Sequence, residues 1–238
     1  MIKDDDAVLF EVLTTQRAQV GIATLNSPRT LNGLSLPMCE LLFDKLQAWA
    51  KDPSIAFVVL SAAGDKAFCA GGDLHGIYQS ILNNETGNAW DNPYTRRFFD
   101  IEYRLDYLLH KYPKPIVCWG SGIVMGGGVG LLMGVSHRVV TETTRWAMPE
   151  ISIGLFPDVG GTWMLSRLPG GTGRFLALTG AQLNASDCLF MGLADHAVPS
   201  GSWGAFIDSI KATAWQDDYR RNAIELDRIL GTMAFPEA

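Results

Sequence analysis

Residues 148–161 read Met148-Pro149-Glu150-Ile151-Ser152-Ile153-Gly154-Leu155-Phe156-Pro157-Asp158-Val159-Gly160-Gly161. This stretch places two carboxylates eight residues apart in an apolar segment that glycine and proline interrupt. Because apolar surroundings penalise charge, Glu150 and Asp158 must each find a partner, raise their pKa or take part in chemistry. A glycine-rich stretch at 120–134 lies just upstream and offers backbone N–H donors. Together the two stretches indicate acyl chemistry with a carboxylate and an oxyanion hole.

Length and composition are those of a globular protein. The 238 residues suffice for one large domain or two small ones, and 47% are hydrophobic while 18% are charged. A net charge of −6 argues against a nucleic-acid surface, which needs clustered Lys and Arg. The first six residues lack an apolar region after a basic one, so we expect no secretory signal. We also expect no membrane span, because glycine interrupts the most apolar stretch, 116–134.

Cysteine and histidine spacing gives no sign of a disulfide framework or a metal site. The cysteines are far apart and form no C-x-x-C pair, a pattern typical of reduced, buried thiols in a cytoplasmic enzyme. The histidines have no metal-ligand spacing either. The residues concerned are Cys39, Cys69, Cys118 and Cys188, and His75, His110, His137 and His196.

Hydrophobic periodicity predicts strands that alternate with helices, which indicates an α/β fold. A hairpin opens the chain, and Ser35 with Pro37 begins the first helix as an N-cap and first-turn proline. No stretch has the composition of a linker between domains. The expected strands are 8–14, 18–25, 55–60, 116–119, 137–141 and 195–198. The expected helices are 35–50, 94–111, 128–133, 162–168, 174–178, 185–191, 203–215 and 217–230.

Two glycine-rich loops could supply the oxyanion hole. Ala70-Gly71-Gly72 and Met125-Gly126-Gly127-Gly128 each follow an expected strand, and the second enters a helix. Glycine lets the backbone approach a ligand closely, and one N–H group from each loop would bind a developing oxyanion. The alternative is tight strand-to-helix packing, and either loop alone is a weak signal. Dinucleotide-binding, P-loop and serine-hydrolase glycine motifs are absent from the sequence.

The candidate carboxylates also have structural interpretations. Glu150 could be a strand-end carboxylate that backbone N–H groups satisfy, and Asp158 could be the N-cap of the next helix. Glu102 lies on the expected helix 94–111 with no basic residue three or four positions away, so it could simply reach water at the edge of the apolar stripe.

Several motifs resemble those of the crotonase (enoyl-CoA hydratase/isomerase) superfamily. Lys66-Ala67-Phe68-Cys69-Ala70-Gly71-Gly72-Asp73 and Gly122-Ile123-Val124-Met125-Gly126-Gly127-Gly128-Val129-Gly130 are similar to its two oxyanion loops. Ala147-Met148-Pro149-Glu150, followed by 154–161, resembles one branch, the 3-hydroxyisobutyryl-CoA hydrolases. The segments 98–103 and 177–180 are also similar to that branch, and the resemblance runs from about Val8 to Ser200.

This resemblance implies a crotonase-like spiral of ββα units followed by C-terminal helices. Residues 1–200 would form the catalytic core, and 201–238 would begin a helical C-terminal region that continues further in relatives. The oxyanion donors would be the N–H groups of Ala70 and Gly127. The carboxylates of the acyl pocket would be Glu102, Glu150 and Asp158.

One position departs from the superfamily pattern. Its hydratases usually carry two catalytic glutamates, one of them three residues after the middle glycine of the Gly-Gly-Gly run. Here that position is Gly130, whereas Glu150 matches the other glutamate. The mechanism that adds water across a double bond with two glutamates is therefore incomplete in this chain.

The resemblance therefore implies an enzyme that hydrolyses a short-chain 3-hydroxyacyl-CoA, above all 3-hydroxyisobutyryl-CoA in valine catabolism. Glu150 would act as a nucleophile or as the base that activates water, and Asp158 would position water, the substrate hydroxyl or the leaving thiol. CoA is part of the substrate, and no further cofactor or metal is expected. Superfamily contacts also suggest a homo-oligomer. The alternatives are an enoyl-CoA hydratase or isomerase on the same fold, and a binding protein without catalysis.

Overall fold

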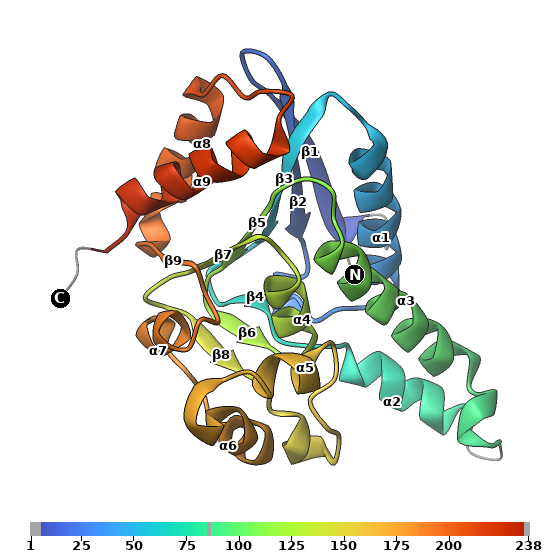
Figure 1. The fold of residues 1–238 in the computed structure, drawn as a ribbon. Helices are drawn as coiled ribbons and strands as arrows, with labels where there is room; N and C mark the ends of the chain where they lie inside the picture. The colour runs from blue at the N-terminus through green and yellow to red at the C-terminus, as the bar shows by residue number, and fades with distance from the viewer. Residues whose placement is uncertain (1–5, 85–86, 236–238) are drawn as a thin grey trace.

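A six-stranded sheet in the order β1-β2-β3-β5-β7-β9 separates two layers of helices in the computed structural model, which describes residues 6–84 and 87–235 (Figure 1). The strands are β1 (Val8–Thr14), β2 (Gln19–Leu25), β3 (Ile55–Ala62), β4 (Ala67–Cys69), β5 (Ile116–Gly120), β6 (Ile123–Met125), β7 (His137–Val140), β8 (Arg145–Ala147) and β9 (His196–Ala197). The α-helices are α1 (Leu36–Lys51), α2 (Leu74–Leu82), α3 (Pro93–His110), α4 (Gly127–Met133), α5 (Gly161–Leu165), α6 (Thr172–Thr179), α7 (Ala185–Phe190), α8 (Trp203–Ala212) and α9 (Tyr219–Met233).

The large sheet begins with the expected hairpin and continues with parallel strands. β1 pairs with β2 in antiparallel register, with Val8 opposite Leu25, and every later pair in this sheet is parallel. Parallel pairs need crossover connections, and the helices between the strands supply them. The expected α/β fold is thus confirmed at the level of its elements.

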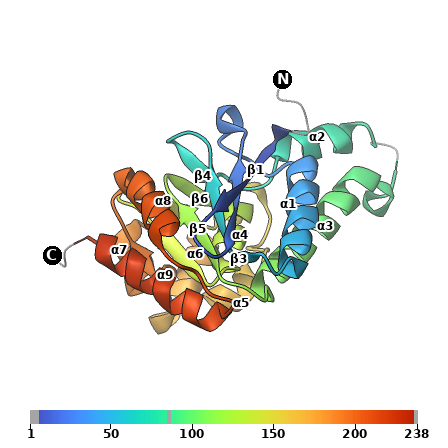
Figure 2. The ribbon, with the colours of Figure 1, turned by 90° about the horizontal axis from the view of Figure 1, so that it is seen from above.

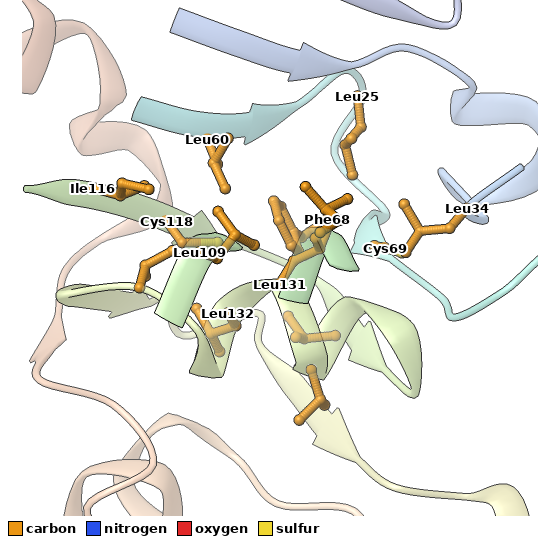
Figure 3. Close-up of a cluster of buried hydrophobic side chains, with 14 of the residues drawn as sticks. Leu25, Leu34, Leu60, Phe68, Cys69, Leu109, Ile116, Cys118, Leu131 and Leu132 are labelled. Carbon is orange, nitrogen blue, oxygen red and sulfur yellow. The ribbon is translucent and has the colours of Figure 1, made fainter. Parts of the chain in front are cut away.

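Alternate residues of the central strand β3 enter two different cores. Val58 and Leu60 pack into a cluster with α1, α3 and α4, whereas Phe57 and Val59 pack into a second cluster with α8 and α9. This division follows from the two-residue period of a strand. Side chains of the large sheet, of β4 and of α4 meet in the first cluster (Figure 3). The two helical layers lie on opposite sides of the sheet, as both views show (Figures 1 and 2).

Two long helices of the first layer begin at N-caps. The Ser35 side chain accepts a hydrogen bond from the Met38 N–H, as the sequence predicts, and the Asn92 side chain accepts one from the Thr95 N–H. Helix α3 buries one stripe at helical spacing, and this stripe includes Glu102 beside Leu105. The predicted helix at 94–111 is therefore confirmed, and its apolar face includes a buried carboxyl group, that of Glu102.

A second, three-stranded sheet in the order β4-β6-β8 was not expected. Its strands are three residues each, and all pairs are parallel. Strands this short have no readable period, and their partners lie far away in sequence, so local patterns do not reveal them. Helix α2 was also missed, and α8 ends at Ala212, three residues before the expected end.

None of the helices in the described part of the chain combines the length and apolar composition that a membrane span needs. All four cysteines are buried and free.

Candidate active site

The small sheet brings the two glycine-rich loops together. Gly71 follows β4 with φ +110°, and Gly126 follows β6 with φ +51°, a region of backbone space that favours glycine. A Cβ atom at Gly71 would lie 3.5 Å from the Met125 carbonyl oxygen and 3.9 Å from the Gly127 nitrogen. The loops therefore meet backbone to backbone. Gly127 is the first residue of α4, where an N–H group has no partner within its own helix.

The structure corrects one of the two predicted oxyanion donors. The Ala70 N–H already donates to the Leu31 carbonyl at 3.0 Å and is not available to a ligand. The Gly72 N–H makes no hydrogen bond within residues 6–84 and 87–235, and a Cβ atom at Gly127 would lie 3.6 Å from its nitrogen. Gly72 is thus the donor that can pair with Gly127. The sequence could not distinguish three consecutive amides, because the acceptor Leu31 lies far upstream.

A cavity of about 140 Å³ lies between these loops. Both loops line it, and so do the three carboxylates that the sequence singled out. The structure therefore assembles the predicted carboxylates beside the oxyanion loops. These residues are Glu102 from α3, Glu150 from the 3-10 segment η4 (Glu150–Ile153) after β8, and Asp158 from the loop before α5.

Glu150 is buried, with 6% of its surface exposed. Its Oε2 has no hydrogen-bond partner among the described residues, and a Cβ atom at Gly126 would lie 3.1 Å from its Oε1. Burial raises the pKa of Glu150 to about 7, and the Asp158 charge adds to the shift. A carboxylate that titrates near neutral pH is suited to accept and return a proton.

Glu102 lies deeper in the site, with 3% of its surface exposed, so the interpretation that it reaches water is wrong. A Cβ atom at Gly127 would lie 2.6 Å from Oε1 of Glu102. The Glu102 carboxyl group therefore fits only because position 127 is glycine. Burial, followed by the charges of Asp106, Asp158 and Glu150, raises the pKa of Glu102 to about 9. At neutral pH this group is a neutral hydrogen-bond donor.

Asp158 is held by a side chain from α3. Its Oδ2 accepts a hydrogen bond from the Tyr103 hydroxyl at 2.8 Å. Burial raises the pKa of Asp158, while the Tyr103 hydrogen bond opposes this rise. The alternative role of Asp158 as a helix N-cap is wrong, because the N-cap of α5 is Gly160 and no side chain caps that helix.

Gly130 has no room for the glutamate that superfamily hydratases carry at this position. A Cβ atom there would lie 2.7 Å from the Val159 Cβ and 2.9 Å from Oδ1 of Asp106. Asp106 was not predicted as a site residue, although it lies one helical turn after Glu102, a spacing that places both on one face of α3. Its Oδ2 is buried without a partner in the described part of the chain. Burial and the Asp158 charge raise its pKa to about 8.

Asp158 also lines a larger cavity of about 490 Å³. Asp158 borders both cavities, and Tyr103 and Asp106 border the larger one. Its other lining groups are mostly apolar or aromatic, and they include Tyr107, Phe156 and Trp163.

Comparisons with known proteins place these features in context. Residues 20–234 match the family model described as enoyl-CoA hydratase/isomerase. The mitochondrial 3-hydroxyisobutyryl-CoA hydrolase of Gallus gallus is 46% identical over 191 residues, which make up 80% of this chain and 48% of that protein. The chain spans about half the length of the curated relatives it matches.

Two solved structures extend the comparison to the fold. A carnitinyl-CoA dehydratase from Mycobacterium thermoresistibile superposes with a TM-score of 0.83 at 40% identity, over 98% of this chain and 62% of that one. An enoyl-CoA hydratase from Rhodobacter sphaeroides superposes with a TM-score of 0.78 at 37% identity, over 93% of this chain and 65% of that one.

Proposed function

Because the chain belongs to the enoyl-CoA hydratase/isomerase family, we propose that it hydrolyses the thioester of a short-chain 3-hydroxyacyl-CoA. The observation that carries this proposal is the packing around Gly130, where Val159 and Asp106 take the space of the second hydratase glutamate. Glu150 remains as the acid-base group beside the oxyanion loops. The hydrolase names of the curated relatives support 3-hydroxyisobutyryl-CoA as the substrate, in line with the expected role in valine catabolism.

The thioester carbonyl would lie between the N–H groups of Gly72 and Gly127. Both donors belong to the backbone. Backbone hydrogen bonds to Leu34 flank Gly72, and Gly127 begins α4, so little reorganisation is needed when negative charge develops on the oxygen. In other enzymes with an oxyanion hole, the loss of one donor costs about 2.7–4 kcal/mol of transition-state stabilisation.

Glu150 would carry the proton transfers. As a base, its carboxylate takes a proton from water while the water oxygen bonds to the carbonyl carbon. The tetrahedral intermediate then breaks the C–S bond, and Glu150 returns the proton to the CoA sulfur. As a nucleophile, Glu150 would instead bond to the carbonyl carbon and expel CoA, and water would cleave the resulting anhydride. Both routes require the ionised carboxylate.

The remaining carboxyl groups would recognise the 3-hydroxyacyl part of the substrate. Neutral Glu102 can donate a hydrogen bond to the substrate hydroxyl, and Asp158 can orient this hydroxyl, the attacking water or the leaving thiol. The proposed steps use carboxyl and backbone groups of the chain, and CoA enters as part of the substrate.

Thiol release from 3-hydroxyisobutyryl-CoA tests the proposal. We expect release by the wild-type chain and a loss of at least about 100-fold in Glu150→Gln, because the amide can neither accept the proton nor attack. Glu11→Gln is the matched control, since Glu11 is exposed on β1, and it should retain full turnover. Near-normal release by Glu150→Gln would contradict both routes.

A hydratase or dehydratase is the second candidate, and the dehydratase structure at 40% identity favours it. Glu150 would then act as the single acid-base group. Incubation with crotonyl-CoA distinguishes the two functions, because hydration consumes the enoyl thioester without releasing thiol. Hydration of crotonyl-CoA without any thiol release from the 3-hydroxyacyl thioester would replace the hydrolase proposal.

A further inference from the structure

The hydrogen bond between Tyr103 and Asp158 connects α3 to the loop before α5. The Tyr103 hydroxyl donates to Asp158 Oδ2 at 2.8 Å across 55 residues of sequence. The Tyr103 ring packs against Phe99 with ring centroids 5.7 Å apart, and Phe99 packs edge-on against Phe98 at 5.3 Å. The donor therefore belongs to a row of packed aromatic rings on α3 and is next to Glu102 in the sequence.

The backbone that carries Asp158 is strained. Val159, the next residue, has φ +42°, which a β-branched side chain rarely adopts. Such a conformation persists only where the surroundings hold it in place. Here the Val159 side chain packs into the space over Gly130, and the Tyr103 hydroxyl holds the neighbouring carboxylate. Two contacts thus hold the loop, one through Val159 and one through Asp158.

The carboxyl groups around Asp158 do not attract its carboxylate and therefore do not hold it in place. Carboxyl groups face it from α3, through Glu102 and Asp106, and from η4, through Glu150. The described residues that line the two cavities include no Lys or Arg. His110, in the lining of the larger cavity, is the one residue among them with a basic side chain. Within the described ranges, the Tyr103 hydroxyl is the one side-chain group found donating a hydrogen bond to the Asp158 carboxylate.

We propose that Tyr103 is a positioning residue for the reaction, and that its hydroxyl fixes Oδ2 of Asp158 so that Oδ1 is left for the substrate hydroxyl or water. The reaction named here rests on the proposed function. Tyr103 does not act on the substrate itself; it fixes the orientation and the ionised state of the carboxylate that does. Without the hydroxyl, Asp158 would be free to turn toward the larger cavity.

Replacing Tyr103 by Phe removes the hydroxyl and keeps the aromatic row. A hydroxyl that donates to the ionised form lowers the pKa of a carboxyl group, so its removal should raise the pKa of Asp158 further. We expect kcat/KM for thioester hydrolysis to fall about tenfold or more, the equivalent of one hydrogen bond to a charged group. Tyr107→Phe is the matched control, because Tyr107 lies one turn further along α3, lines the same larger cavity and makes no hydroxyl hydrogen bond to a described residue.

A titration of carbon-13-labelled aspartate side chains reads the same contact without any substrate. The Asp158 signal, assigned with Asp158→Asn, should titrate at higher pH in Tyr103→Phe and stay unchanged in Tyr107→Phe. An unchanged Asp158 titration together with unchanged kcat/KM would overturn the proposal. If the wild-type chain releases no thiol, the proposed function fails separately, and the titration still decides whether Tyr103 controls Asp158.

Discussion

Four carboxyl groups share one small region of this molecule, and they differ in how strongly burial and neighbouring charges favour the neutral form. Glu102 and Asp106 have pKa values raised to about 9 and about 8, whereas Glu150 titrates at about 7. A separation of this kind assigns roles, because a group that is neutral at working pH donates and an ionised one accepts. Glu150 is the member of the set best suited to cycle between the two states.

The ionisation of Glu150 should appear directly in the pH dependence of thiol release. Both hydrolytic routes need the carboxylate form, so protonation below its pKa of about 7 removes activity. We expect kcat/KM to rise with pH and level off above an apparent pKa near 7. Steady-state rates between pH 5 and pH 9 measure this limb. A profile that stays flat over this range would show that Glu150 does not limit the reaction.

Site residues were predictable from sequence where the chemistry depends on side-chain type. Carboxylates in apolar segments marked Glu150 and Asp158, and motif resemblance added Glu102; the cavity contains all three. The amide at Ala70 was the wrong donor, because a backbone hydrogen bond to Leu31 leaves no trace in a local pattern. Asp106 was missed because its burial depends on the absence of a side chain at Gly130.

At the scale of elements, the distance between α4 and β4 sets the spacing of the two amides that we propose as oxyanion donors. Gly128 lies in the first turn of α4, and a Cβ atom there would lie 2.3 Å from the Cys69 carbonyl oxygen at the end of β4. The nearest atoms are the carbonyl group and the Cβ of Cys69, and none of them is the end of a flexible side chain. The loop that carries Gly72 begins directly after Cys69, so any separation of the two elements also separates the donors.

Gly128→Ala should therefore lower both stability and activity. We expect a loss of about 1–3 kcal/mol in the free energy of unfolding, as for other overpacked sites, together with slower thiol release. Chemical denaturation and steady-state rates measure the two effects. Gly231→Ala in α9 is the control, since nothing lies within 4 Å of its Cβ position, and it should stabilise the chain by about 0.4–1 kcal/mol. Equal stability of the two variants would contradict this account of α4.

Elements with strong local signals were predictable, and elements defined by distant pairing were not. The opening hairpin, α1 and α3 were confirmed, because alternation, N-caps and helical spacing are all local. The small sheet escaped detection although it carries both oxyanion loops. The fold class could thus be derived from the sequence, while the element that aligns the donors could not.

For the whole molecule, the carboxyl cluster ties stability to pH. The pKa of Asp106 is raised from 3.8 to about 8 on folding, so the folded chain holds a proton that the unfolded chain releases in this range. Stability from this group is fully present below pH 3.8 and is lost as pH rises toward 8. Glu102 and Glu150 act in the same direction.

Asp106→Asn should remove this part of the pH dependence, because the amide does not ionise. We expect the variant to gain in unfolding free energy over the wild type between pH 5 and pH 8, by at least about 1.4 kcal/mol, the equivalent of one pKa unit. Denaturant titrations at several pH values measure the difference. Parallel curves for the two proteins over this interval would show that Asp106 is already ionised in the folded state.

The short parallel sheet β4-β6-β8 also bears on the order in which the chain folds. Ala67 pairs with Ile123, and Ile123 with Arg145, so the two oxyanion amides become neighbours only after long loops have closed. Closing such loops costs conformational entropy before any pairing contact forms. Each of these strands has only three residues with which to offset that cost. The hairpin and helices α1 and α3 can form earlier from local contacts. We therefore expect the two amides to come together late in folding, after the chain has become compact.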